Sequence, residues 1–157
     1  MGPGHRGKKP EAGYSIMELA LVMGIVGVLT AVAMPFFLSY YQASRLRVGA
    51  EEVAAFLNQG RQLGIRENAG VCVHITSTAL QYRLGSSCAG ATWVGPGTDA
   101  NGSVNVPQGV TLTTAADPIF SYLGAANPGA TITVTNTRNG RALNVTVAAS
   151  GRVSIGP

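Results

Sequence analysis

The strongest pattern in the chain is one long apolar run near its N-terminus. Residues 14–34 contain a single charged residue, Glu18, and the run ends at Pro35. About 20 apolar residues are enough for a helix to cross a bilayer, at roughly 1.5 Å per residue. Because a carboxylate is costly in hydrocarbon, Glu18 indicates a helix that gains a partner rather than one that stays alone in lipid. We expect Pro35, which lacks an amide hydrogen, to kink or locally open this helix.

Beyond Pro35 the apolar residues recur at helical spacing, and charged residues occupy the other faces. The stripe consists of Leu46, Ala50, Val53, Leu57 and Gly60. Asn68 and Gly70 then form a stop signal for the helix. The pattern therefore predicts one helix over about residues 14–67, apolar all round in residues 14–35 and one-sided in residues 36–67.

Residues 68–157 have the short alternating runs and turn residues of a β-rich domain. Asn139-Gly140 is a strong hairpin turn signal between two of these runs. Residues 85–109 are rich in Gly, Ser, Asn and Pro, which predicts a long loop with at most one short strand. The predicted strands are 71–75, 79–84, 110–113, 119–122, 130–135, 141–148 and 152–155. Because a sheet with one apolar face needs a cover, we expect an α+β fold, with one antiparallel β-sheet domain packed against the second half of the helix.

The composition does not favour an enzyme or a nucleic-acid-binding protein. Charged residues make up 11% of the 157 residues, and the formal net charge is +4. Residues 1–13 hold three lysines or arginines and one glutamate, so the remainder carries about +2, too little to indicate nucleic acid. The adjacent acidic pair Glu51 and Glu52 is predicted on a helix, where neighbouring side chains point apart. With no metal-ligand cluster and no phosphate-binding glycine loop in the sequence, we expect no catalytic residues, no metal and no cofactor.

The two cysteines, Cys72 and Cys88, suit a disulfide in an oxidising compartment. In the chain-entropy model, closing a loop of about 15 residues stabilises a domain by about 3 kcal/mol. Two unpaired buried thiols are the alternative, and the sequence leaves both open.

The order of a basic leader, an apolar run and a polar remainder predicts export with the N-terminus held inside. The small residue that suits cleavage, Gly13, precedes the apolar run instead of following it. Removal of residues 1–13 as a leader would leave the apolar segment attached. We therefore expect a single-pass membrane protein whose globular domain lies on the far side of the membrane; the family resemblance given next implies that this membrane is the inner membrane and that the domain lies in the periplasm.

Gly13, the aromatic Tyr14, Glu18, the apolar run and Pro35 resemble the N-terminal signal of type IV pilins and pseudopilins. The resemblance implies that a prepilin peptidase cuts after Gly13 and methylates the new amino terminus at Tyr14, which replaces the commoner phenylalanine. It also implies that Glu18 pairs with that amine on a neighbouring subunit during filament assembly. The alternative for Glu18 is an interfacial glutamate near a helix start, where the helix dipole favours it.

The rest of the chain is more loosely similar to the H-type minor pseudopilins of type II secretion and to T-type minor pilins. This resemblance is carried by Gln59-Gly60-Arg61, the strand at 71–75, Phe120 with Gly124, and Gly151-Arg152-Val153. It implies a minor subunit that helps to initiate or cap a type IV pilus or a type II secretion pseudopilus. Its partners would be other pilin or pseudopilin subunits, contacted through the N-terminal helix.

Two other functions remain open at this point. Some T-type minor pilins bind DNA during natural transformation through a Gly-Arg-x-Arg segment, of which this chain has only Gly151-Arg152. Arg138 and Arg141 would have to join Arg152 in one basic patch, because affinity for DNA grows with the number of phosphates neutralised. The plainer interpretation of Arg152 is a solvated residue on an edge strand. The second alternative is a membrane-tethered domain that never polymerises, for which Glu18 is dispensable.

Overall fold

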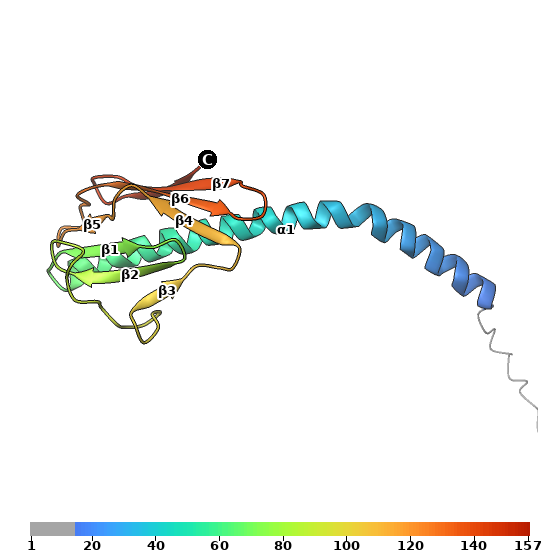
Figure 1. Cartoon of the computed structure of the whole chain (residues 1–157), viewed down its shortest axis with the longest axis horizontal. Coiled ribbons are helices and arrows are strands. Elements are labelled where there is room, and N and C mark those ends of the chain that lie inside the picture. The colour runs from blue at the N-terminus through green and yellow to red at the C-terminus, as the bar shows by residue number, and fades with distance from the viewer. Residues whose placement is uncertain (1–14) are drawn as a thin grey trace, which may run out of the picture. The chain divides into compact units, whose positions relative to one another are not determined.

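The computed structural model describes residues 15–157, so Gly13, Tyr14 and the predicted leader lie outside the described residues. Within the described part, one long helix precedes eight strands (Figure 1). The elements are α1 (Ile16–Arg66), β1 (Val71–Ile75), β2 (Ala79–Leu84), β3 (Ser103–Asn105), β4 (Val110–Thr114), β5 (Ile119–Phe120), β6 (Ala130–Asn136), β7 (Ala142–Val147) and β8 (Val153–Gly156). The helix and the strand-rich remainder confirm the α+β class predicted from the sequence.

The chain divides into two compact units, residues 1–39 and 40–157, and α1 contributes a section to each. Every residue of the first section of α1, Ile16–Ser39, is exposed. By length and composition alone, α1 can cross a membrane. The helix continues through Pro35 without interruption. This first section therefore presents apolar side chains on all sides, as its sequence predicts.

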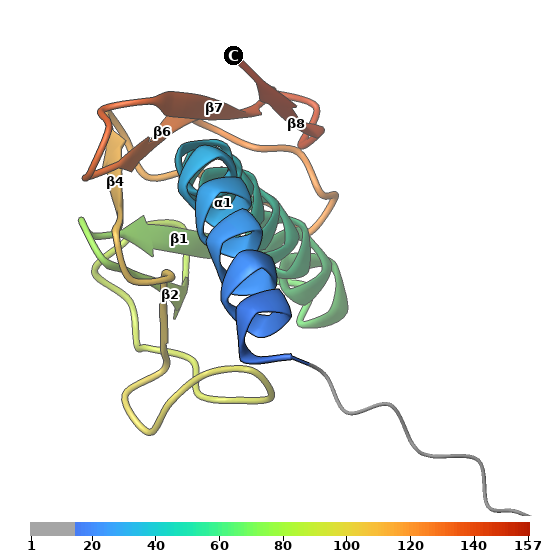
Figure 2. The same ribbon diagram turned by 90° about the vertical axis from the view of Figure 1, so that its right-hand side faces the viewer.

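The second unit is built around the second section of α1 (Figure 2). Its strands form two four-stranded antiparallel sheets, one in the order β3-β2-β1-β5 and the other in the order β4-β6-β7-β8. The buried positions of α1 are Leu46, Gly49, Ala50, Val53, Phe56, Leu57, Gly60, Leu63 and Gly64. All five residues of the predicted stripe are among them. The helix contributes six side chains to one hydrophobic core that it shares with buried residues of both sheets: Leu46, Ala50, Val53, Phe56, Leu57 and Leu63.

The strands divide between two sheets, a division that the sequence does not specify. β5 pairs with the outer edge of β1, and the nearby carbonyl oxygen of Pro118 accepts a hydrogen bond from the Val73 amide at 2.9 Å. β4 lies in the other sheet and pairs with β6, from Val110 opposite Asn136 to Thr114 opposite Ile132. The long-range pairing partner of a short strand does not follow from its own apolar pattern, so the sequence leaves this division open.

The first hairpin and the disulfide are both as expected. β1 and β2 pair from Val71 opposite Leu84 to Ile75 opposite Leu80, and the connecting turn closes as Thr76 N–H donates to the Ala79 oxygen at 2.9 Å. Cys72 and Cys88 are bonded to each other, with their Cα atoms 5.2 Å apart. The alternative of two free thiols is excluded.

The turn after β5 also departs from the prediction. The sequence places a strand over residues 119–122, but β5 ends at Phe120. The Ser121 amide donates to the Ala125 oxygen, and the Gly124 amide donates to the Ser121 oxygen, each at 2.8 Å. Gly124 has a φ of 79°, which reverses the chain. Tyr122 therefore lies in a tight turn and not in a sheet.

Candidate interaction site at the helix end

Three separate segments meet at the C-terminal end of α1. Arg61 comes from the helix, Gly124 from the turn after β5, and Gly151 from the turn between β7 and β8. A Cβ atom built on Gly124 would lie 2.8 Å from Arg61 Nε, and one built on Gly151 would lie 3.2 Å from the same atom. A Cβ on Gly151 would also clash with the Gly124 carbonyl oxygen. The glycines therefore let both turns close over the guanidinium.

Glycine is also required at both turns by backbone conformation. Gly124 has a φ of 79° and Gly151 a φ of 77°, a region that residues with a Cβ rarely adopt. The two turns are joined by a hydrogen bond of 3.0 Å from the Ala126 amide to the Ala149 oxygen. Most of the segments that carry the looser resemblance in the sequence thus converge on Arg61.

Arg61 is partly buried, and its Nε atom is buried without a hydrogen-bond partner. An unsatisfied buried donor costs about 1–3 kcal/mol, more when it belongs to a charged group. The two turns at Gly124 and Gly151 enclose this Nε atom in spite of that cost.

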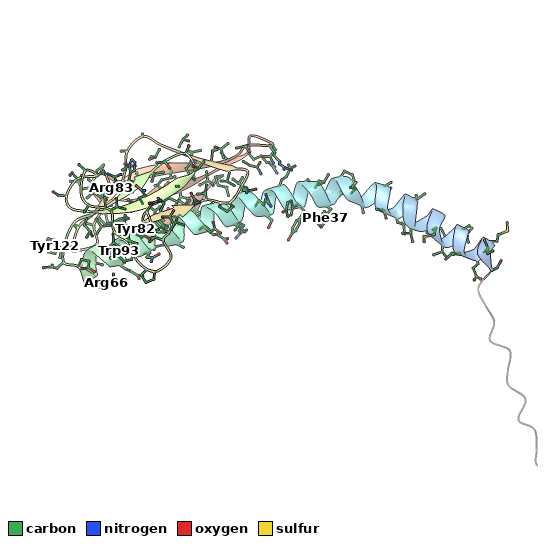
Figure 3. All side chains as sticks on the ribbon, turned by 60° about the horizontal axis from the view of Figure 1, so that its bottom comes forward. Phe37, Arg66, Tyr82, Arg83, Trp93 and Tyr122 are labelled. Atoms are coloured by element: carbon green, nitrogen blue, oxygen red, sulfur yellow. A yellow bond between two sulfur atoms is a disulfide. The ribbon has the colours of Figure 1, made fainter. Side chains whose placement is uncertain are left out.

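Large apolar side chains are exposed around Arg61. Tyr122 and Leu123 occupy the two central positions of the turn closed by Gly124, and they are 54% and 73% exposed. Turn centres normally hold small or polar residues, so folding does not require an aromatic and a leucine here. Ile65, one helical turn beyond Arg61, is 49% exposed, and its Cδ1 atom would lie 3.0 Å from a Cβ on Gly124. Figure 3 shows Tyr122 at this end of the domain.

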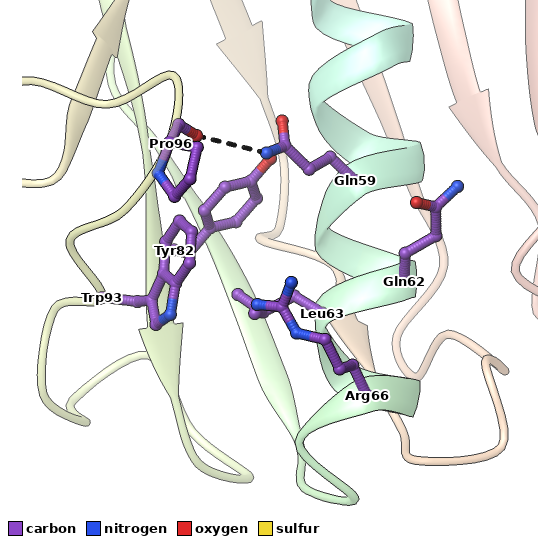
Figure 4. A pocket seen from close by; sticks show the side chains of 7 residues that line it. All are labelled: Gln59, Gln62, Leu63, Arg66, Tyr82, Trp93 and Pro96. Atoms are coloured by element: carbon purple, nitrogen blue, oxygen red, sulfur yellow. Dashed lines mark hydrogen bonds between the residues drawn. The ribbon is translucent and has the colours of Figure 1, made fainter.

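A pocket of about 340 Å³ opens beside the same helix end (Figure 4). It is lined by Gln59, Gln62, Leu63, Arg66, Tyr82, Trp93 and Pro96. The Gln59 amide donates to the Pro96 oxygen at 3.4 Å, which ties the long loop to the helix. Arg66 Nε lies 3.3 Å from a carboxylate oxygen of Glu67. The pocket thus combines two side-chain amides, a guanidinium and an indole, all of which can donate hydrogen bonds.

Two residues that line this pocket, Tyr82 and Trp93, belong to an aromatic cluster with Phe56. Tyr82 lies parallel to Phe56 with ring centroids 4.0 Å apart, and Trp93 meets Tyr82 edge-on at 5.7 Å. The Tyr82 hydroxyl donates to the Phe56 carbonyl oxygen at 2.8 Å. Burial raises the pKa of the Tyr82 phenol well above its usual value. A Cβ on Gly60 would lie 2.9 Å from a methyl carbon of Val73, so this glycine allows the sheet to approach the helix.

The three arginines of the predicted basic patch do not lie together. Arg138 and Arg141 flank the turn at one end of β7, where the neighbouring Asn139 donates to the Gln42 side chain at 3.1 Å. Arg152 follows the opposite end of β7, in the turn that leads to β8. The six residues of β7 separate the two ends by roughly 20 Å. Arg152 therefore lies beside the Arg61 site and apart from Arg138 and Arg141.

The assembly residues predicted from the sequence fall in the first section of α1. Glu18 is exposed in the first turn of the helix, and Ser15 precedes that turn, its side-chain oxygen accepting from the Met17 amide at 3.3 Å. Pro35 is exposed within the same section. The cleavage and methylation residues, Gly13 and Tyr14, lie outside the described residues.

One side-chain hydrogen bond, between His74 and Asp117, was not expected from the sequence. His74 Nδ1 lies 2.7 Å from an oxygen of Asp117, whose other oxygen accepts from the Ile75 amide at 3.0 Å. The pair fastens the segment before β5 to β1. Asp117 also lies near Cys72 and Cys88, but the two sulfurs are bonded to each other and offer no thiolate to a metal. The residues were too far apart in sequence for their pairing to be predicted.

Comparison with known proteins agrees with this architecture. No family model matches the chain. Two fimbrial proteins of Pseudomonas aeruginosa are 29% identical over 77 residues, which is 49% of this chain and 49% of each protein. The matched segment thus spans about half the length of these curated relatives.

Solved structures resemble a larger part of the chain. The type IV minor pilin FimU of P. aeruginosa strain PAO1 aligns with TM-scores of 0.54 and 0.55 in two crystal forms, at 16% and 14% identity. These alignments cover 71% and 75% of this chain, and 93% and 92% of FimU. The minor pseudopilin EpsH of the Vibrio cholerae type 2 secretion system aligns with a TM-score of 0.54 at 11% identity, covering 71% of this chain and 95% of EpsH. The chain therefore has a pilin-like fold, which confirms the resemblance predicted from the sequence at the level of fold.

Proposed function

We propose that the chain is a minor pilin or minor pseudopilin, a structural subunit of a type IV pilus or a type II secretion pseudopilus. The observation that carries the proposal is the first section of α1, joined to a domain of pilin-like fold. Every residue of Ile16–Ser39 is exposed, and Glu18 is the only charged residue in that section. Such a surface is stable only in lipid or against other apolar helices.

The proposed mechanism is an exchange of lipid contacts for helix packing. A prepilin peptidase cuts after Gly13 and methylates Tyr14, and the subunit waits in the inner membrane on its helix. Glu18 then pairs with the amine of Tyr14 on a neighbouring subunit. Two charges that are costly alone in hydrocarbon neutralise one another when the helices meet, so the pair selects one register.

The globular domain is proposed to face the periplasm before assembly. The Cys72–Cys88 disulfide supports this location, because structural disulfides persist in oxidising compartments and are rare in the cytosol. The role within the filament is initiation or capping, through contacts with other minor subunits. The fold is shared by a minor pilin and a minor pseudopilin, so both machines fit it.

The DNA-uptake alternative receives no support from the arrangement of the arginines. It required Arg138, Arg141 and Arg152 in one patch, and they lie at the two ends of β7. Even together, Arg152 and the partly buried Arg61 would neutralise only two phosphates, which is a weak contact for DNA. We therefore keep the structural role as the proposal.

Replacing Glu18 distinguishes the proposed filament subunit from the alternative, a membrane-tethered domain that never polymerises and does not need Glu18. We expect Glu18→Ala to be cleaved normally but to stay in the membrane fraction when filaments are sheared from the cells and counted by immunoblot. Glu51→Ala is the matched control, because Glu51 is an exposed glutamate of the same helix that pairs with Arg47 one turn away. It should enter filaments as the unmodified chain does. Equal incorporation of Glu18→Ala and Glu51→Ala would overturn the proposed role of Glu18.

A further inference from the structure

The surface over Arg61 has properties that the fold itself does not require. We define the helix-end surface by Arg61, Ile65, Tyr122, Leu123 and Arg152. From these residues we infer that it docks a neighbouring filament subunit that presents carboxylates beside apolar side chains. The inference rests on the proposed function and adds the surface and the chemistry of the partner.

The apolar part of this surface is large and exposed. Tyr122, Leu123 and Ile65 are 54%, 73% and 49% exposed, and the turn that carries the first two packs next to the third. Exposed apolar side chains that gather in one place mark interaction sites more often than scattered ones do. Tyrosine is also among the residues that contribute most to binding at protein interfaces.

The surface is held rigid before binding. Two hydrogen bonds of 2.8 Å close the turn around Tyr122, and a third ties it to the turn before Arg152. Arg61 lies under both turns with its Nε enclosed. A partner that binds here does not have to order a loop, which lowers the entropic cost of association.

The charge of the surface selects an acidic partner. Arg61 and Arg152 supply two guanidinium groups, and none of the five residues is acidic. Glu67, near the helix end, is already paired with Arg66 at 3.3 Å. A guanidinium beside apolar groups binds a carboxylate strongly, because it can donate two parallel hydrogen bonds in a partly desolvated site.

A protein fits this surface better than a nucleic acid. Single-stranded DNA is held by a basic groove that follows several phosphates, with aromatic rings stacked on the bases. Here the surface offers two arginines together with a leucine and an isoleucine, while Arg138 and Arg141 lie at the other end of β7. Apolar contact flanked by isolated charges is the arrangement typical of protein interfaces.

The test uses the full chain in cells that assemble the filament. A photo-reactive amino acid replaces Leu123, and a second chain carries it at Asn139, exposed at the opposite end of β7. After irradiation, adducts in the sheared-filament fraction are mapped by mass spectrometry. We expect the Leu123 position to give an adduct with a filament subunit, at a site with Asp or Glu next to apolar residues, and the Asn139 position to give no adduct at that site.

Reversing the charge of Arg152 then tests whether the adduct at Leu123 depends on a charged contact or only on closeness to the partner. We expect Arg152→Glu to lower the adduct yield about tenfold while the chain still enters filaments. Arg138→Glu, the same charge reversal at an exposed residue at the other end of β7, is the matched control and should leave the yield unchanged. Changing the mapped carboxylate of the partner to lysine should restore the yield in Arg152→Glu.

Several results would overturn the inference. These are a chain present in filaments without an adduct at Leu123, a nuclease-sensitive adduct, an adduct to a surface without carboxylates, or a yield that Arg152→Glu leaves unchanged. Each of them leaves the proposed function intact, because the chain is still found in filaments. Absence of the chain from filaments would overturn both.

Discussion

The phenol of Tyr82 allows the packing around the helix end to be tested quantitatively. Its hydroxyl donates to the Phe56 carbonyl at 2.8 Å, inside the core between the sheet and α1. Tyr82→Phe removes that hydrogen bond and keeps the ring stacked 4.0 Å from Phe56. The Phe56 carbonyl lies inside the helix and keeps its place in the backbone ladder. We therefore expect the free energy of unfolding to fall by about 1 kcal/mol at neutral pH.

The same substitution should reverse its effect at alkaline pH. Burial raises the pKa of the Tyr82 phenol, while in the unfolded chain it titrates near 10. Above that pH the unfolded state loses a proton that the folded state keeps, so the stability of the unmodified protein falls by about 1.4 kcal/mol per pH unit. Phenylalanine has no proton to lose. The two proteins should be equally stable between about pH 10.5 and 11, and Tyr82→Phe should be the more stable above that.

Urea unfolding of the full chain in detergent micelles measures this difference. Trp93 is the only tryptophan, and it lies 5.7 Å from the Tyr82 ring, so its fluorescence reports on this part of the core. When the free energies of unfolding of the two proteins are subtracted at each pH, the contributions of titratable groups that both proteins share cancel. Tyr122→Phe, at an exposed tyrosine, is the control for the substitution itself and should change the free energy of unfolding at neutral pH by less than about 0.5 kcal/mol. A difference between wild type and Tyr82→Phe that stays constant up to about pH 11.5 would refute the reasoning.

Two further stability predictions concern the disulfide and the glycine beside Arg61. The double substitution Cys72→Ser and Cys88→Ser should lower the free energy of unfolding by about 3 kcal/mol, because the bond closes a loop across 16 positions. An unchanged urea midpoint, with or without reductant, would contradict that figure. Gly151→Ala should destabilise by about 2 kcal/mol or more, since the new Cβ adds a clash with the Gly124 carbonyl to an unfavourable φ of 77°. Gly97→Ala is the control, because Gly97 has a φ of 88° but open space around it, so the substitution adds only the backbone cost. It should lower the free energy of unfolding by only about 1–2 kcal/mol. Equal losses for Gly97→Ala and Gly151→Ala in thermal unfolding would argue against close packing at Gly151.

The local pattern of the sequence predicted most of the elements. The apolar stripe predicted which face of the helix is buried. Alternating apolar residues between turn residues predicted the strands, with ends that agree with the structure to within about two residues. Asn139-Gly140 forms the expected hairpin turn, with Gly140 at a φ of 67°. These features depend on residues close in sequence. Local propensities and hydrogen bonds determine them before any tertiary contact forms.

Long-range pairing was harder to predict. β5 pairs with β1, where the amide of Val73 also donates to the carbonyl of Pro118, whereas β4 pairs with β6 in the other sheet. Tyr122 follows an apolar pair and so continued the strand pattern, although Gly124 ends it. Neither effect leaves a periodic signal in the sequence.

The candidate site was only partly visible in the sequence. Arg61, Gly124 and Gly151 belong to segments that carried the resemblance, but only the fold brings them together. Arg152 was grouped with Arg138 and Arg141 because all three lie near the C-terminus in sequence. A strand of six residues is long enough to separate them, which shows why closeness in sequence did not predict a shared patch.

The central proposal is that this chain is processed after Gly13 and becomes part of a filament. The most direct measurement is the intact mass of the chain recovered from purified, sheared filaments. We expect a chain that begins at Tyr14, carries one N-terminal methyl group and contains the Cys72–Cys88 disulfide. A chain that is found only in the membrane fraction, or that still carries residues 1–13, would contradict it.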